Sequence, residues 1–267
     1  MLKVRVASAV LMALALLAIV YGLPSLGTLV LIVLIVLAGA WEWTALVPIH
    51  RYAGRALTVL VFLSLLTLAW RHAANPPGLR QILWIALLWW SVALLWILLA
   101  PQRVSRIAAA LAGTLALGPG AIALVHLRMD YPAGSNWLLL ALAVVAAADT
   151  GAYFAGKTLG RVKLAPQISP GKTWEGVVGG SLLAMMIAAL GAKLLGSPLY
   201  AAVLAAAIAA GYSVVGDLTE SMLKRHAGVK DSSALLPGHG GLLDRIDSIC
   251  AGVPILLLCW IQFGVLA

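Results

Sequence analysis

Long apolar runs, separated by short polar segments, follow one another along almost the whole chain. A helix needs about 20 apolar residues to cross the roughly 30 Å of hydrocarbon in a bilayer. Nine runs reach or approach this length, and each predicts a membrane-spanning helix. They lie near residues 4–21, 25–47, 56–70, 81–100, 107–127, 137–156, 177–192, 199–215 and 249–266. The third and seventh runs are short, but cationic side chains at their ends can extend to the headgroups.

Composition agrees with this pattern. Hydrophobic residues make up 63% of the 267 residues and charged residues 10%, with a mean hydropathy of +1.04. A soluble domain has about 45–50% apolar and about 25% charged residues. A water-soluble fold is therefore excluded, and we expect an all-α polytopic membrane protein with about nine transmembrane helices.

The balance of charges predicts how the chain lies in the membrane. The formal net charge is +9, but no run of five or more basic residues occurs, so we predict no nucleic-acid partner. If the N-terminus is cytoplasmic, 14 of the 18 lysines and arginines are cytoplasmic as well, as the positive-inside rule requires. The outer loops then hold only Arg71, Arg80, Arg128 and Lys193. Both polar loops, 157–176 and 216–248, fall on the cytoplasmic face.

Acidic residues are scarce, and five of the nine lie close together in the second of these loops. They are Asp217, Glu220, Asp231, Asp244 and Asp247. Cationic and histidine side chains are interleaved with them: Lys224, Arg225, His226, Lys230, His239 and Arg245. A solvated loop can have this composition, but charges at a membrane boundary are costly unless they are paired or functional.

The spacing of these residues indicates a phosphate and metal site. Five residues share one face of a helix that continues the eighth apolar run: Asp217, Glu220, Ser221, Lys224 and Arg225. Asp244 and Asp247 stand three apart at the head of the ninth run, and glycines at 238, 240 and 241 let the backbone approach a ligand. Carboxylates converging in this way suit Mg²⁺, which also takes substrate phosphates, and the nearby cations would neutralise those phosphates.

A second polar cluster precedes the first. Asp149 lies near the cytoplasmic end of an apolar run, and a basic segment with Lys157 and Lys172 follows. A basic loop that leads into a helix would show the same pattern, so the residues alone leave the two readings open.

Three further patterns in the sequence resemble functional sites. Gly151–Thr158 spells the P-loop pattern GxxxxGKT, but it lies within a predicted transmembrane helix, which leaves no free amides for phosphate. Ser221, His239 and Asp244 could form a hydrolase triad, but no nucleophile elbow accompanies them. Glu42, between two tryptophans, is either a functional intramembrane acid or part of an interfacial aromatic belt.

The segment 221–247 resembles the phosphatidate cytidylyltransferase family. That family's pattern is S-x-x-K-R, then K-D, then P-x-H-G-G-x-x-D-R-x-D, and every one of these positions matches between Ser221 and Asp247. The stretches Asp149–Gly156 and Ser169–Gly176 are similar to two upstream motifs of the family. The specific match covers about residues 149–247, and residues 1–140 add little beyond hydropathy.

The resemblance implies an enzyme that uses CTP and phosphatidic acid, needs Mg²⁺ and releases pyrophosphate. It also implies a second metal ion, which could be a monovalent cation such as K⁺, and a homodimer in a bacterial inner membrane. By motif position, Asp217 and Asp244 would hold the metal, with Asp247, Asp231 and Asp149 as further candidates. We expect a single domain over 1–267, in which 1–140 is mostly scaffold and 141–267 carries the catalytic helices and cytoplasmic active-site loops.

Individual roles follow as expectations. The catalytic set is Asp217, Lys224, Arg225, Lys230, Asp231, Asp244 and Arg245, and the metal set is Asp217, Asp244 and Asp247. The substrate- and nucleotide-binding set is Asp149, Lys172, Ser221, His239, Gly240 and Gly241. Lys224, Arg225 and Lys230 would bind phosphates, while His239 and its neighbouring glycines would shape the nucleotide loop.

Two other functions stay as alternatives. A CTP-dependent polyprenol or phytol kinase would use the same nucleotide but transfer its γ-phosphate to a neutral lipid alcohol. A membrane transporter would explain the many helices, but transporters tend to show internal repeats and charges near the midplane, whereas these charges crowd one face.

Overall fold

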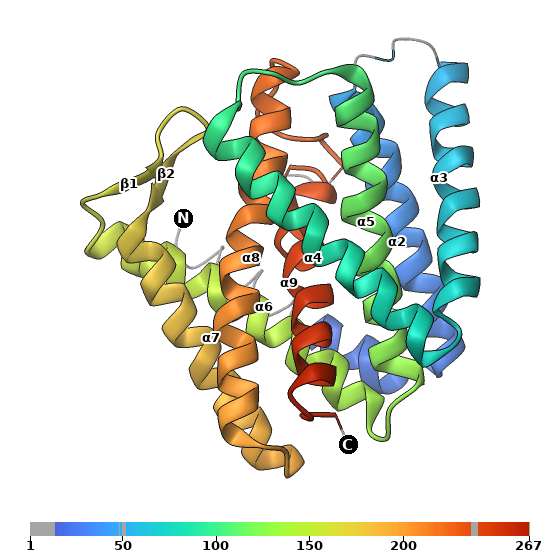
Figure 1. Cartoon of the computed structure of the whole chain (residues 1–267), viewed down its shortest axis with the longest axis vertical. Coiled ribbons are helices and arrows are strands. Elements are labelled where there is room, and N and C mark those ends of the chain that lie inside the picture. Colours follow the sequence, from blue (N-terminus) through green and yellow to red (C-terminus); the bar gives the residue numbers. More distant parts are fainter. Residues whose placement is uncertain (1–13, 48, 50–51, 236–239, 267) are drawn as a thin grey trace.

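The computed structural model describes residues 14–47, 49, 52–235 and 240–266, which form a bundle of long helices (Figure 1). The helices are α2 (Ser25–Leu46), α3 (Tyr52–Ala73), α4 (Pro76–Leu99), α5 (Arg106–Met129), α6 (Gly134–Thr158), α7 (Trp174–Leu195), α8 (Leu199–His226) and α9 (Leu243–Gln262). Residues 14–22 are also helical, whereas the beginning of the first predicted helix lies outside the described residues. A short antiparallel hairpin of β1 (Lys163–Ala165) and β2 (Ser169–Thr173) joins α6 to α7.

The predicted all-α membrane architecture is confirmed. Seven of the described helices, α2 to α8, are long and apolar enough to cross a membrane. The short third and seventh predictions become full 22-residue helices, because the helices continue through polar and charged residues at their ends. The eighth helix continues to His226, so the charged face from Asp217 onward is helical as predicted. The hairpin was not predicted.

Local sequence signals account for where several helices begin. Asn75 accepts a hydrogen bond from the Gly78 amide at 2.9 Å, and the prolines that follow it suit the first turn of α4. Ser105 caps α5 in the same way through the Ala108 amide at 3.1 Å. Thr173, the last residue of the hairpin, caps α7 through the Gly176 amide at 3.1 Å. The hairpin and α7 are therefore joined at a fixed point.

Helix α9 is the centre of the bundle. Every residue from Cys250 to Trp260 is buried, and α9 packs against α8, α5, α4 and α6. Helix α3, by contrast, lies at the edge of the bundle, on the right in Figure 1, and most of its side chains are exposed. In a membrane protein such an exposed apolar face suits contact with lipid.

Glycines let the site-bearing helices approach closely. A Cβ atom at Gly151 would lie 2.7 Å from the Gly179 carbonyl oxygen, so α6 and α7 meet backbone to backbone. The GxxxxGKT pattern thus lies inside α6 and serves helix packing there. A Cβ atom at Gly216 would lie 2.6 Å from the Asp247 carbonyl oxygen, so α8 and α9 also touch. This contact brings Asp217 and Asp247 into one neighbourhood.

The connections gather at the two ends of the bundle. The hairpin, the segment 100–105 and the end of α8 lie toward the upper end in Figure 1, and the turns 130–133 and 196–198 lie toward the lower end. The two polar loops thus share one end of the bundle, as the charge pattern requires.

Candidate active site

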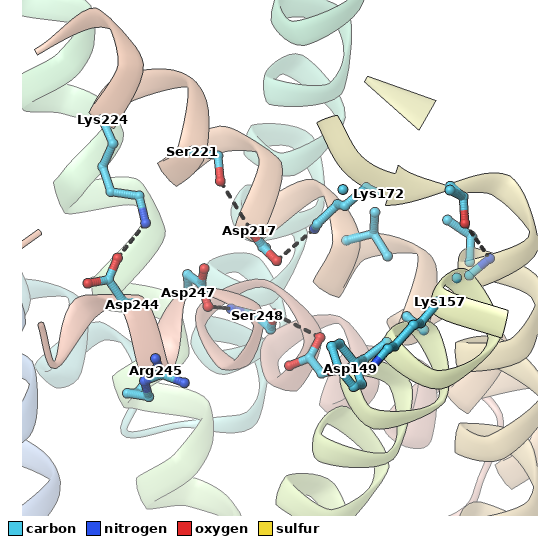
Figure 2. A pocket seen from close by; sticks show the side chains of 18 of the residues that line it. Asp149, Lys157, Lys172, Asp217, Ser221, Lys224, Asp244, Arg245, Asp247 and Ser248 are labelled. Carbon is cyan, nitrogen blue, oxygen red and sulfur yellow. Dashed lines mark hydrogen bonds and ion pairs between the residues drawn. The ribbon is translucent and has the colours of Figure 1, made fainter. Parts of the chain in front are cut away.

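A polar cavity of about 760 Å³ opens among α6, the hairpin, α7, α8 and α9 (Figure 2). Six cationic and five acidic side chains line it. The cationic ones are Lys157, Lys172, Lys224, Arg225, Lys230 and Arg245; the acidic ones are Asp149, Asp217, Asp231, Asp244 and Asp247. Charged groups so concentrated at one end of an apolar bundle mark a functional site.

One part of the cavity is formed where the hairpin faces α8. Lys172 Nζ lies 2.7 Å from Asp217 Oδ2, and the two side chains are 22% and 33% exposed. Ser221, one turn further along α8, donates a hydrogen bond to Asp217 Oδ1 at 3.2 Å. A partly exposed pair of this kind contributes little to stability, so a charged ligand can compete for either partner.

Asp149 and Asp247 lie beside this pair, as Figure 2 shows. Ser248, at the start of the apolar part of α9, donates a hydrogen bond to Asp149 Oδ1 at 3.1 Å. The carboxylates of Asp149 and Asp247 each repel that of Asp217. Two acids that each repel Asp217, with cations at hand, form with it a group that a divalent cation would stabilise.

A second part of the cavity is buried. Lys224 of α8 forms an ion pair with Asp244 at the head of α9, and both side chains are less than a tenth exposed. Lys224 Nζ also lies 3.1 Å from Glu220 Oε1, whose side chain is 1% exposed. Glu220 belongs to the acidic cluster of the sequence but not to the predicted catalytic, binding or metal sets. Together the three residues hold α8 against the first turn of α9.

The second oxygen of Asp244 holds the loop between the two helices. Asp244 Oδ2 accepts hydrogen bonds from the Gly241 amide at 2.7 Å, the Ser232 amide at 3.0 Å and the Ser232 hydroxyl at 3.1 Å. Gly240 has φ +79°, a conformation that favours glycine. The glycine motif therefore turns the backbone inward onto Asp244.

The structure brings most of the predicted site residues together. Eleven of them line the one cavity: Asp149, Lys172, Asp217, Ser221, Lys224, Arg225, Lys230, Asp231, Asp244, Arg245 and Asp247. Gly240 and Gly241 lie behind the lining, next to Asp244. His239 lies outside the described residues. The Ser221 hydroxyl donates to Asp217, which is not a member of the Ser221–His239–Asp244 triad.

Sequence reasoning missed some of the lining. Tyr153, Thr173 and Ser248 also face the cavity. Each lies on the same helix or strand as a predicted site residue and close to it in sequence. That proximity is the sequence feature that could have identified them.

The oxygen donors of the cavity fit Mg²⁺. Among the described residues, no group of three or more histidine, cysteine or acidic side chains forms a ready-made metal cage. Mg²⁺ does not need one, because it binds through one or two carboxylates, water and substrate phosphates. Asp217 and Asp247 can supply such carboxylates, whereas both oxygens of Asp244 already accept hydrogen bonds.

Comparisons with known proteins show which family the chain is similar to. Residues 3–262 match the model of the cytidylyltransferase family. The chain is 41% identical over 237 residues, 85% of each protein, to a phosphatidate cytidylyltransferase of Pseudomonas aeruginosa. It is 35% identical over 279 residues, which cover 95% of this chain and 96% of the relative, to a phosphatidate cytidylyltransferase of Haemophilus influenzae. A phosphatidate cytidylyltransferase of Bacillus subtilis is 44% identical over 125 residues, 46% of each protein.

Proposed function

The chain belongs to the cytidylyltransferase family, and we propose that its cavity transfers the cytidylyl group of CTP to phosphatidate. The products are CDP-diacylglycerol and pyrophosphate. The observation that carries this proposal is the polar cavity at the end of an apolar bundle, where a lipid phosphate and a nucleotide can meet. The names of the relatives support it.

The chemistry asks little of a general base. A phosphate oxygen of phosphatidate attacks the α-phosphorus of CTP in line, a new P–O bond forms, and the bond to the pyrophosphate oxygen breaks. The attacking oxygen is anionic at neutral pH, so no proton has to be removed from it. The harder task is to hold two polyanions together, and charge neutralisation with positioning achieves this.

The cavity has side chains for both tasks. Lys172, Arg225, Lys230 and Arg245 line it and can bind phosphate oxygens. Lys224 is held by Asp244 and Glu220, so its charge would attract the substrate phosphates from the wall of the cavity. Lys172 would exchange Asp217 for a substrate phosphate when CTP binds.

Mg²⁺ is part of the proposal. Asp217 and Asp247 would hold it, with Asp149 beside them, and the ion when bound would neutralise phosphate charge. Asp244, which the motif pattern also predicts as a ligand, could join only by giving up hydrogen-bond donors that it accepts in this structure. A second, monovalent cation is implied by the family resemblance alone.

We place the cavity on the cytoplasmic side of a bacterial inner membrane, as the cation distribution favours. Phosphatidate would then enter sideways from the inner leaflet. We also propose a homodimer, on the basis of the family resemblance.

The direct test measures CDP-diacylglycerol formed from labelled CTP and phosphatidate in detergent micelles, with Mg²⁺ and with excess chelator. Mg²⁺-dependent CDP-diacylglycerol with an equal amount of pyrophosphate supports the proposal. Release of CDP with a lipid alcohol as acceptor would favour the kinase instead. Product formation that persists in chelator would contradict the metal assignment while leaving the transferase.

A further inference from the structure

Glu42 is a buried acid that the reaction described above does not use. It lies one turn before the end of α2, in the half of the chain expected to be scaffold, and it is 5% exposed. A buried carboxylate without partners is costly, so its partners reveal its role.

Among the described residues, four donors converge on the two oxygens of Glu42, and all four come from the loop between α8 and α9 or from the start of α9. The Ser233 hydroxyl at 2.6 Å and the Leu242 amide at 3.1 Å donate to Oε1. The Ser232 hydroxyl at 2.9 Å and the Leu243 amide at 2.8 Å donate to Oε2. These partners lie about 190 to 201 residues away in sequence.

The two oxygens of the Glu42 side chain offer enough lone-pair sites to accept from all four donors. The amides of Leu242 and Leu243 also belong to the N-terminal end of α9, where free N–H groups and the helix dipole favour a negative charge. Glu42 thus caps α9 from a different helix.

The contacts continue from Glu42 into the cavity. The Ser232 hydroxyl lies between Glu42 and Asp244, 2.9 Å from one and 3.1 Å from the other. Asp244 in turn pairs with Lys224. Asp231, next to Ser232 in the chain, faces the cavity directly. A shift of the loop at Ser232 would therefore move cavity-lining groups.

Gly241 shows how closely the loop is held. A Cβ atom there would lie 1.9 Å from the Ser232 hydroxyl oxygen and 2.7 Å from Glu42 Oε2. Only glycine lets the backbone pass between these two side chains. Gly241 of the motif is therefore needed for the approach to Glu42, whereas Gly240 provides the turn.

We propose that Glu42 is a positioning residue for cytidylyl transfer: from α2 it fixes the Ser232–Ser233 segment and the start of α9, and thereby the cavity-lining groups beside them. This inference rests on the proposed function. It extends the functional machinery into residues 1–140. The neighbouring Trp43 does not take part, because its indole N–H donates to the Ala109 carbonyl at 2.8 Å and ties α2 to α5.

The test compares Glu42→Gln with Ser233→Ala, their double variant, and Asp130→Asn. Asp130→Asn is the control for loss of a carboxylate away from the cavity, because Asp130 directly follows α5 at the other end of the bundle and pairs with His126 there. The full chain in detergent is assayed for kcat and KM, and hydrogen exchange is followed at residues 231–235 and 240–243. Wild-type activity in the same assay tests the proposed function separately from the role of Glu42.

We expect Glu42→Gln to lower kcat by about tenfold to a hundredfold, because misplacing reacting groups by about 1 Å can cost a hundredfold. KM for CTP should change less, since attraction between charges falls off slowly with distance. Exchange should speed up at Leu242 and Leu243, with the helices remaining protected. The double variant should be little worse than Glu42→Gln, because the two changes remove parts of one network.

Either of two results would overturn the inference. One is wild-type kcat and wild-type loop protection in Glu42→Gln. The other is a double variant in which the separate losses of kcat simply multiply. If Glu42→Gln fails to fold, Ser233→Ala decides alone: lower kcat with faster exchange in the loop supports the role, and unchanged kcat refutes it.

Discussion

The cavity contains two Lys–Asp pairs that look alike in sequence but lie in different surroundings. We call the pair Lys172–Asp217 the hairpin side and the pair Lys224–Asp244 the loop side. The hairpin-side residues are 22% and 33% exposed, whereas the loop-side residues are 9% and 8% exposed. Asp244 also accepts hydrogen bonds from the Ser232 and Gly241 amides, and it shares the Ser232 hydroxyl with Glu42. The same two residue types therefore form a contact that a ligand can replace on the hairpin side and a buried structural contact on the loop side.

Burial decides between these roles. An exposed ion pair is worth about 0–1 kcal/mol, so a phosphate or a metal ion can replace one of its partners at little cost. Removing one partner of a buried pair leaves a charge without compensation and costs several kcal/mol. We infer that ligands exchange on the hairpin side, while the loop side holds the geometry in place.

The strongest test of this contrast is Asp244→Ala. The substitution leaves the Ser232 and Gly241 amides without their acceptor and Lys224 paired with Glu220 alone. The free energy of unfolding should therefore fall by about 3 kcal/mol and activity should be lost. Thermal unfolding in detergent together with the transfer assay measures both. Wild-type stability in this variant would mean that the loop side is as replaceable as the hairpin side.

Asp217→Asn should separate activity from stability. Its partner Lys172 is partly exposed, so the free energy of unfolding should change by less than about 1 kcal/mol. Turnover should fall by at least about a hundredfold, because a carboxylate that would hold Mg²⁺ beside the substrate phosphates is lost. The same two assays decide the point, and a loss of stability as large as that of Asp244→Ala would erase the distinction between the sides.

The sequence predicted the shared location of these residues well, for a physical reason. Apolar runs of bilayer length indicate helices, and scarce charges at one end of them indicate a site. The spacing from Asp217 to Lys224 placed these side chains on one helix face, and α8 confirms it. Helical periodicity is local, so it can be read without knowing the fold.

What the sequence did not predict depends on distant contacts. The role of Glu42 arises from Ser232 and Ser233, which lie 190 and 191 residues away. The difference between the two Lys–Asp pairs depends on burial by neighbouring helices, which spacing does not encode. The hairpin was missed because its strands are only three and five residues long and lack an alternating apolar pattern.

A smaller effect is expected for Lys172→Gln. The substitution leaves Asp217 in place but removes the cation that would exchange it for a substrate phosphate. KM for CTP should rise by about tenfold, which matches the loss of one charge-assisted hydrogen bond of about 1.5 kcal/mol. Steady-state kinetics at saturating phosphatidate measure this, and thermal unfolding should stay unchanged. An unaltered KM would mean that CTP does not bind on the hairpin side.

The smallest predicted effect concerns Lys157, whose ammonium lies 5.7 Å from the centre of the Tyr153 ring at the mouth of the cavity. An exposed cation there should attract an anionic lipid through long-range forces, so Lys157→Gln should raise the apparent KM for phosphatidate about two- to threefold at low salt. Near 1 M salt, where the Debye length is about 3 Å, the variant and the wild type should converge. Lys193→Gln is the control, because Lys193 lies near the end of α7 that faces away from the cavity. An equal effect of both substitutions would show that phosphatidate responds to net charge and has no preferred approach to the hairpin side.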